Sequence, residues 1–322
     1  MKETIVRHAV GVDFGGTSVK LALVNDRGQI KARKSVVTKE LPSKDAWVDT
    51  VATAIEKLCE RDGAEPVKLE GIGIGVPGFV DFEKGYIYDL PNVPGWKGVN
   101  LGDIMAKRTG LHVRIDNDVN AMAVGECTFG AGRTYQHAVF VTWGTGVGGG
   151  LLINNQLYRG AYSMAGEIGH ISIDRNGIQS PTGFGGVEQY VGNRQLSQRA
   201  VKALDEGRKS VLQTLCGGDR SQISPKLIKQ AASQGDELAI EILDFATDCL
   251  ATMFASLTYA LQPQAFIIGG GIAEEADQLF ELLRKNVNRR LSPHFAEKLE
   301  IRPAQLANDA GVIGCATLTL LE

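Results

Sequence analysis

The chain has 322 residues, of which 43% are hydrophobic and 22% charged, and its formal net charge is −3. This length and composition favour about two globular domains and exclude a fully disordered protein. Because the sequence has neither a basic stripe nor a long apolar run, we expect no nucleic-acid partner and no membrane-spanning segment. Five single cysteines without CxxC spacing, and no signal-peptide pattern, favour the reducing cytoplasm.

Predicted strands and helices alternate along the chain, which favours the α/β class. The strands are expected at residues 9–14, 19–24, 29–38, 69–76, 112–117, 137–143, 148–153 and 265–268. The helices are expected from Ser43, from about Val119, after Ser224 and Pro225, and over 236–261. A strand, a glycine–threonine turn and a returning strand occur twice, about 130 residues apart, so we infer a duplicated unit.

Both of these turns have the composition of a phosphate-binding site. In the first, Asp13 ends a strand and is followed by Gly15, Gly16 and Thr17. Glycines let the backbone approach a ligand closely, and free N–H groups bind phosphate oxygens, while Asp13 can hold Mg²⁺ through water. The second is GTGVGGG, residues 144–150. A plain hairpin turn remains the alternative for each.

A third glycine run, residues 269–271, follows a predicted buried strand and precedes a predicted helix. Nucleotides bind at such junctions in open α/β sheets. Its spacing does not match GxGxxG, and the chain has no GxxxxGK[ST] motif, so a Rossmann dehydrogenase and a P-loop enzyme are disfavoured.

Two further motifs carry titratable groups. Asp118, in NDVN, follows a predicted strand, where a carboxylate can accept a hydroxyl proton during phosphoryl transfer or can merely cap the next helix. Both interpretations stay open. GEIGH places Glu167 three residues before His170, where the pair can bind a metal or a polyol, or His170 can be structural.

Taken together, the motifs resemble those of the ROK family of repressors and kinases, and most of all its glucokinase-type sugar kinases. The matching segments are DFGGTSVK (13–20), VPGFVD (76–81), NVPGWKGV (92–99), NDVNAMAVGE (117–126), GTGVGGG, GEIGH, IIGGGI (267–272) and NDAGVIGCA (308–316). The resemblance implies the α/β actin-like ATPase (ribonuclease H-like) fold, with two related domains around a cleft. We expect these domains at 1–121 with 309–322, and at 122–308.

The resemblance also implies an ATP:hexose phosphotransferase that uses ATP and Mg²⁺ and forms a homodimer. Asp118 corresponds to the catalytic base. The implied sugar contacts are Gly78, Asn92, Asn117, Asp118, Glu167, His170 and Glu188. The implied nucleotide and magnesium positions are Asp13, Gly15, Gly16, Thr17, Lys20, Thr145, Gly146, Gly270 and Gly271.

One departure concerns zinc. Many members of this family carry CxCGxxGCxE after GH, but here the cysteine positions hold Gln179, Pro181 and Gly186, and only Glu188 remains. A structural zinc ion needs about four ligands, so we predict none. His170 must then be oriented by a hydrogen bond, for which Gln179 or a backbone carbonyl is the candidate, and the loop is expected to be more mobile than in relatives with zinc.

Glucose is the expected acceptor, through its 6-hydroxyl group, but fructose, mannose, allose and N-acetylmannosamine stay open because one hydroxyl can reverse a preference. A repressor is disfavoured because little sequence precedes Asp13 to hold a DNA-binding domain. A sugar sensor without turnover and an actin-like filament protein are disfavoured by the NDVN motif and by the sugar-side motifs, respectively.

Overall fold

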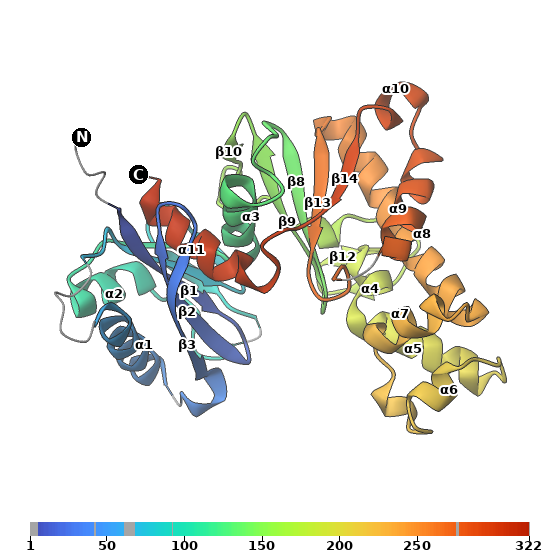
Figure 1. Cartoon of the computed structure of the whole chain (residues 1–322), viewed down its shortest axis with the longest axis horizontal. Helices are drawn as coiled ribbons and strands as arrows, with labels where there is room; N and C mark the ends of the chain where they lie inside the picture. The colour runs from blue at the N-terminus through green and yellow to red at the C-terminus, as the bar shows by residue number, and fades with distance from the viewer. Residues whose placement is uncertain (1–5, 42, 61–67, 92, 275–276, 322) are drawn as a thin grey trace. The chain divides into compact units, whose positions relative to one another are not determined.

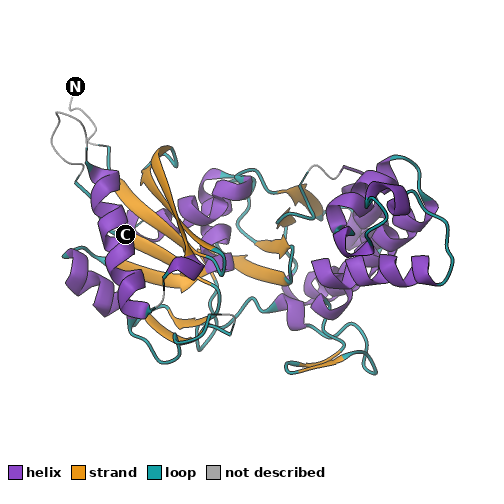
Figure 2. Ribbon diagram, turned by 90° about the horizontal axis from the view of Figure 1, so that it is seen from below, coloured by secondary structure: helices purple, strands orange, loops and turns teal. Residues whose placement is uncertain are grey.

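The protein is described here by a computed structural model that covers residues 6–41, 43–60, 68–91, 93–274 and 277–321. Strands and helices alternate along it, as predicted (Figure 2). The chain divides into two compact units: Met1–Thr134, Gly150–Gly166 and Gln305–Glu322 form unit 1, and Tyr135–Gly149 and Glu167–Ala304 form unit 2. The expected domain boundaries after residues 121 and 308 stay a prediction.

The first sheet contains the first glycine turn. Its strands are β1 (His8–Phe14), β2 (Ser18–Asn25), β3 (Ile30–Val37), β4 (Ile72–Val76) and β7 (Val113–Asn117), in the order β3-β2-β1-β4-β7 (Figure 1). β1 runs antiparallel to β2 and parallel to β4, which is parallel to β7. The carboxyl ends of β1 and β7, which carry Asp13 and Asn117, therefore lie at the same edge of this sheet.

The second sheet repeats this plan. Its strands are β8 (Ala138–Trp143), β9 (Val147–Ile153), β10 (Gln156–Leu157), β13 (Ala265–Gly269) and β14 (Glu300–Pro303), in the order β10-β9-β8-β13-β14. β13 is parallel to both β8 and β14. In each sheet a glycine turn joins the central strand to the next strand in sequence. The two strands on the other side of the central strand run parallel to it. The predicted duplication is confirmed.

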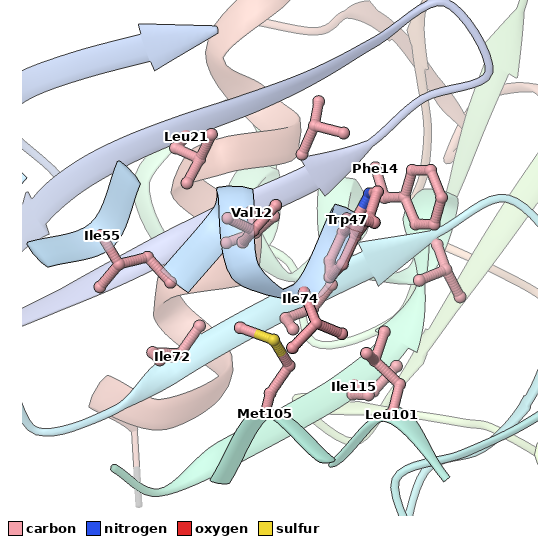
Figure 3. Close-up of a cluster of buried hydrophobic side chains, with 14 of the residues drawn as sticks. Val12, Phe14, Leu21, Trp47, Ile55, Ile72, Ile74, Leu101, Met105 and Ile115 are labelled. Carbon is pink, nitrogen blue, oxygen red and sulfur yellow. The ribbon is translucent and has the colours of Figure 1, made fainter. Parts of the chain in front are cut away.

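One face of the first sheet is covered by α1 (Lys44–Cys59) and α2 (Leu101–Thr109) over a continuous apolar core (Figure 3). Helix α1 begins where predicted, because the Ser43 side chain accepts a hydrogen bond from the Ala46 N–H at 3.1 Å. Such a cap contributes about 1 kcal/mol. Trp47 enters the core from this helix and is 1% exposed.

On the other side of this sheet, α11 (Ala310–Leu320) packs on β1 and β4, and α3 (Asp118–Phe129) packs against α11, β4 and β7 (Figure 1). Glycines allow α11 to approach β1 and α3 closely. A Cβ at Gly11 of β1 would lie 1.8 Å from the Val312 carbonyl oxygen. A Cβ at Gly314 of α11 would lie 1.7 Å from the Ala121 oxygen of α3. Only glycine fits at these two positions. Helix α3 begins at Asp118, one residue before the predicted start.

A buried carboxylate in unit 1 joins two segments that are distant in sequence. Glu126, at the end of α3, is completely buried. Its carboxylate accepts hydrogen bonds from the backbone N–H groups of Ala131 at 2.9 Å, Gln305 at 3.1 Å and Leu306 at 2.6 Å. One buried carboxylate thus holds the turn at Ala131 and the segment at Gln305 and Leu306 to the end of α3.

Unit 2 is rich in helices, of which α8 (Glu237–Leu261) is the longest among the described residues. Residues at helical spacing along it are buried, namely Leu238, Ile242, Cys249, Met253 and Leu257. Phe245, on the same face, is half-buried and is covered by the Arg199 guanidinium at 3.4 Å from the ring centre. The helix ends at Leu261, where Gln262 adopts a left-handed conformation before Pro263. The other helices are α4 (Glu188–Val191), α5 (Asn193–Asp205), α6 (Leu212–Leu215), α7 (Pro225–Ser233), α9 (Asp277–Asn288) and α10 (Pro293–Ala296).

The remaining strands form two small hairpins, β5 (Phe79–Asp81) with β6 (Tyr86–Asp89), and β11 (Gln179–Ser180) with β12 (Gly183–Phe184). Among the residues that the structure describes, no helix is both long enough and apolar enough to cross a membrane.

Candidate active site

Two hydrogen bonds fix the shape of the first glycine turn, between β1 and β2. The Gly15 N–H donates to the Ser18 oxygen at 3.0 Å, and the Thr38 hydroxyl donates to the Gly15 oxygen at 2.8 Å. Gly16 and Thr17 are exposed, and within the described part of the chain their N–H groups donate to no backbone carbonyl. Two free N–H donors in a tight turn suit an anion such as phosphate.

Asp13 lies beside this turn. It is paired across the β1–β2 ladder with Lys20, whose charge lowers the Asp13 pKa, although burial has the larger effect and raises it. A Cβ at Gly311, in the first turn of α11, would come within 2.8 Å of the Asp13 Oδ2 atom. Glycine at 311 therefore leaves space beside the carboxylate, which sequence reasoning did not foresee.

That space and a single carboxylate fit a magnesium ion. Mg²⁺ binds proteins through one or two carboxylates and keeps most of its water. The described residues contain no group of three or more His, Cys, Asp or Glu side chains that could hold a metal ion by themselves. A lone carboxylate such as Asp13 suits an ion that keeps most of its own water ligands.

The NDVN motif spans the junction of β7 and α3. Asn117 caps the helix, because its Oδ1 atom accepts from the N–H groups of Val119 at 2.9 Å and Asn120 at 3.2 Å. Asp118 is the first helical residue, and its Oδ1 accepts from the adjacent Val119 N–H at 2.9 Å. The interpretation of Asp118 as the cap is therefore wrong, since Asn117 fills that role.

The structure brings Asn117 and Gly78 together, because the Asn117 Nδ2 donates to the Gly78 oxygen at 3.2 Å. Gly78 is confined as well, since a Cβ there would lie 2.3 Å from the Asp89 oxygen. Asn92, the remaining predicted sugar contact of this unit, lies outside the described residues.

An aromatic cluster connects the first glycine turn to the NVPGWKGV segment. Phe14, which follows Asp13, has its ring centre 4.8 Å from that of Trp47 and 5.0 Å from that of Trp96. Trp96 is 5% exposed. Packing of this kind is rigid, so the first glycine turn and the segment that carries Trp96 are held to one part of the core.

In unit 2, the second glycine turn is closed by a bond from the Gly144 N–H to the Gly146 oxygen at 3.0 Å. The Glu188 Oε2 accepts from the Val147 N–H at 3.0 Å, and a Cβ at Gly146 would lie 2.1 Å from that oxygen. Glu188, predicted to contact the sugar, is thus bound to the turn that carries Thr145 and Gly146.

Glu167 and His170 lie beside the same turn. The Glu167 Oε2 is 3.7 Å from the His170 Nε2, and a Cβ at Gly169 would lie 2.1 Å from the Val147 oxygen. Burial raises the Glu167 pKa, and the nearby Glu188 carboxylate adds to this, whereas His170 opposes it. Glu167, His170, Glu188 and the turn therefore form one polar cluster.

The orientation of His170 differs from our expectation. The Thr182 hydroxyl, in the β11–β12 hairpin, lies 3.2 Å from the His170 Nδ1, and it also bonds the Ser180 hydroxyl at 2.9 Å. The predicted partner, Gln179 or a backbone carbonyl, is therefore replaced by Thr182, which occupies the first glycine position of the family zinc motif. With Gln179, Pro181 and Gly186 at its cysteine positions, this hairpin does not fit zinc.

The third glycine run follows β13. Gly270 has a φ of +92°, and a Cβ there would lie 2.4 Å from the Trp143 oxygen, so glycine is required. Lys229 of α7, which the sequence did not single out, donates to the carbonyl oxygens of Gly271 at 3.4 Å and Glu274 at 2.5 Å. The next described helix begins at Asp277, several residues after the run.

Comparisons with known proteins agree with these features. Residues 9–321 match the model of the ROK family. The chain is 34% identical to a glucokinase of Thermotoga maritima, over 96% of each chain, and 35% identical to one of Streptomyces coelicolor, also over 96% of each. A solved ROK family glucokinase from Streptomyces griseus, in complex with glucose and AMPPNP, is 32% identical with a TM-score of 0.82, covering 97% of this chain and 98% of that one. The predicted α/β actin-like ATPase fold is confirmed, and the chain belongs to the ROK family.

Proposed function

We propose that this protein is an ATP-dependent glucokinase that transfers the γ-phosphoryl group of ATP to the 6-hydroxyl group of glucose. The observation that carries the proposal is the similarity to glucokinases along almost the entire chain, including one solved with glucose and an ATP analogue. The geometry within each unit agrees with it, because glycine turns and polar side chains suited to a nucleotide and a sugar lie together.

Asp118 is the proposed general base. Its carboxylate lies at the start of α3, where Asn117 caps the helix and the Asp118 Oδ1 accepts from the adjacent Val119 N–H at 2.9 Å. A carboxylate so placed can accept the proton of the attacking hydroxyl group as the oxygen bonds to phosphorus. The products are then glucose 6-phosphate and ADP.

The two glycine turns are the proposed phosphate contacts, through the N–H groups of Gly16, Thr17, Thr145 and Gly146, with Gly270 and Gly271 near the nucleotide. Lys20 supplies a positive charge beside Asp13. Asp13 would hold Mg²⁺, which would neutralise charge on the phosphate oxygens when bound. These donors are fixed before the substrate binds, which is how protein groups stabilise charge that develops in a transition state.

Glu167, His170 and Glu188 are the proposed sugar contacts in unit 2, with Asn117 and Gly78 in unit 1. Carboxylates and an imidazole offer several acceptors, which suits a molecule with many hydroxyl groups. Hydrogen bonds of this kind reject an epimer strongly, because a misplaced hydroxyl leaves a protein group unpaired. A homodimer stays a prediction.

The test is a coupled assay of ADP formation with glucose, fructose, mannose, allose, N-acetylmannosamine and N-acetylglucosamine, with and without Mg²⁺. We expect the highest kcat/KM with glucose. Sugar binding without ADP formation would instead indicate a sensor. Asp118→Asn should lower kcat by about 10²–10⁴-fold while ATP binding is retained. Near-normal turnover in that variant would refute the role of Asp118.

A further inference from the structure

Asp116, two residues before the proposed base, is a buried carboxylate that the proposed chemistry does not use. Its side chain is 1% exposed. Its Oδ2 atom accepts two hydrogen bonds from Arg159, one from Nε at 2.9 Å and one from Nη2 at 2.7 Å. Arg159 follows β10, far from Asp116 in sequence, in the segment that leads to Glu167.

The other oxygen of Asp116 points to the start of α3. Its Oδ1 atom accepts from the Asn117 backbone N–H at 2.8 Å and from the Asn120 Nδ2 at 3.0 Å. The carboxylate therefore lies between the guanidinium group and the first turn of the helix that carries Asp118. A movement of Asp116 would move the peptide that precedes the base.

Arg159 is itself held in place. Its guanidinium carbon lies 3.6 Å from the centre of the Phe82 ring, and its side chain is 21% exposed. A planar guanidinium can stack on a ring and bind a carboxylate with two N–H groups at once, which a lysine ammonium cannot do. Burial raises the pKa of Asp116, and Arg159 opposes this by its charge and its hydrogen bonds.

Asn120 gives an independent sign that this network is specific. Its side-chain oxygen is buried and has no hydrogen-bond partner among the described atoms, whereas its Nδ2 bonds Asp116. Reversing the amide would place two oxygens against each other. The orientation that keeps the bond from Asn120 Nδ2 to Asp116 therefore leaves the Asn120 side-chain oxygen buried and unpaired, which is unfavourable.

From this arrangement we infer that Arg159 is a positioning residue for phosphoryl transfer: through Asp116 it fixes the β7–α3 junction and hence the Asp118 carboxylate. The inference rests on the proposed function, since it presumes Asp118 as the base. Buried ion pairs are weak evidence for stability in themselves, whereas a base displaced by about 1 Å can lose on the order of 10²-fold in rate. The effect should therefore appear in kcat.

The experiment compares Arg159→Gln, Arg159→Lys, Asp116→Asn and the double variant Arg159→Gln/Asp116→Asn. We expect kcat to fall by about tenfold or more in Arg159→Gln, with KM for ATP changed by less than about twofold. Arg159→Lys, which keeps the charge but not the bidentate geometry, should recover part of the loss. The double variant should be no slower than the slower single variant, because both act through one contact.

Arg108→Gln is the matched control, since it removes an arginine of unit 1 that pairs with exposed Asp49 and Glu56. Equal kcat in the Arg159→Gln and Arg108→Gln proteins, or losses that multiply in the double variant, would overturn the inference. If Arg159→Gln does not fold, the folded Arg159→Lys protein decides by the same measure.

Hydrogen exchange of the wild-type and variant proteins separates this inference from the proposed function. Arg159→Gln should speed exchange at the Asn117 N–H and in the first turn of α3, whether or not glucose is the substrate. Unchanged exchange there would contradict the positioning role. A wild-type protein that phosphorylates no sugar would refute the proposed function instead.

Discussion

The pKa of Glu167, a residue of the proposed sugar site, is shifted by its surroundings. Burial raises its pKa, Glu188 raises it further, and His170 lowers it. Because the shift is upward, Glu167 takes up a proton at a higher pH than an ordinary glutamate. As the pH falls through this raised pKa, the carboxylate loses its acceptor for a sugar hydroxyl group, and KM for glucose should rise.

The measurement is KM for glucose between about pH 5 and 8, where an ordinary glutamate stays ionised over most of the range. Glu167→Gln should have a higher KM that no longer varies with pH on the acid side. An identical pH dependence in both proteins would assign the titration to another group.

Thr182 provides the second prediction for a single residue. Its hydroxyl lies 3.2 Å from the His170 Nδ1, so Thr182→Val removes this partner and keeps the shape of the side chain. A hydrogen bond of this kind contributes about 1 kcal/mol, and we expect KM for glucose to rise about fivefold. Thr182→Ser, which keeps a hydroxyl group, is the control. If Thr182→Val binds glucose normally, the hairpin does not orient His170.

Sequence reasoning identified the residues that stand within motifs but not their partners. Local patterns single out Asp13 and Glu167, whereas the resemblance to the family supplies Asn117 and Glu188, and the roles of all four stay predictions. Arg159 belongs to no such pattern, and its role depends on a contact with a residue 43 positions away. Only the tertiary fold shows such a pair.

The second glycine turn makes a test possible at the level of one element. A Cβ at Gly146 would lie 2.1 Å from the Glu188 carboxylate, whereas a Cβ at Gly144, in the same turn, meets nothing within 4 Å. Gly146→Ala must displace Glu188 and break its bond to the Val147 N–H. We expect KM for ATP to rise and kcat to fall, together by about tenfold or more in kcat/KM.

Gly144→Ala is the matched control and should stay within about threefold of the wild type in kcat/KM, because ordinary surface substitutions have small effects. Melting curves of both variants show whether the fold is intact. Equal loss of activity in the two would mean that the flexibility of the turn matters, rather than the contact between Gly146 and Glu188.

At this scale the elements were largely predictable, since strand and helix periodicities are local. β1, β2 and α8 lie within a residue or two of their expected bounds, and α1 begins where expected. The expected strand at 69–76 is shorter, because β4 begins only at Ile72, where pairing with β1 begins. The cap of α3 was assigned to Asp118 as one alternative, because Asn and Asp are both good caps and only the structure shows that Asn117 accepts the bonds.

The whole molecule repeats one plan, a hairpin with a glycine turn followed by parallel strands. The spacing of the two turns predicted this duplication. It could not predict which small residues allow α11 to approach β1 and α3, because those contacts join segments from opposite ends of unit 1. Gly11 and Gly314 meet backbone atoms there. The order of the motifs can therefore be read along the sequence, whereas the packing of the helices against the sheet cannot.

At the scale of the whole protein, we expect a requirement for Mg²⁺ but none for structural zinc. The hairpin of β11 and β12 lacks the cysteines of the zinc motif, and His170 bonds Thr182 instead. Asp13, with space beside it at Gly311, suits Mg²⁺.

Purified protein should therefore contain far less than about one zinc ion per chain. Prolonged chelation should leave its melting temperature unchanged, because a structural zinc ion would contribute to folding. Chelation should abolish phosphorylation of glucose, and Mg²⁺ alone should restore it. Stoichiometric zinc, or a melting temperature that falls with chelation and recovers with zinc, would show that ligands other than the family cysteines hold the ion.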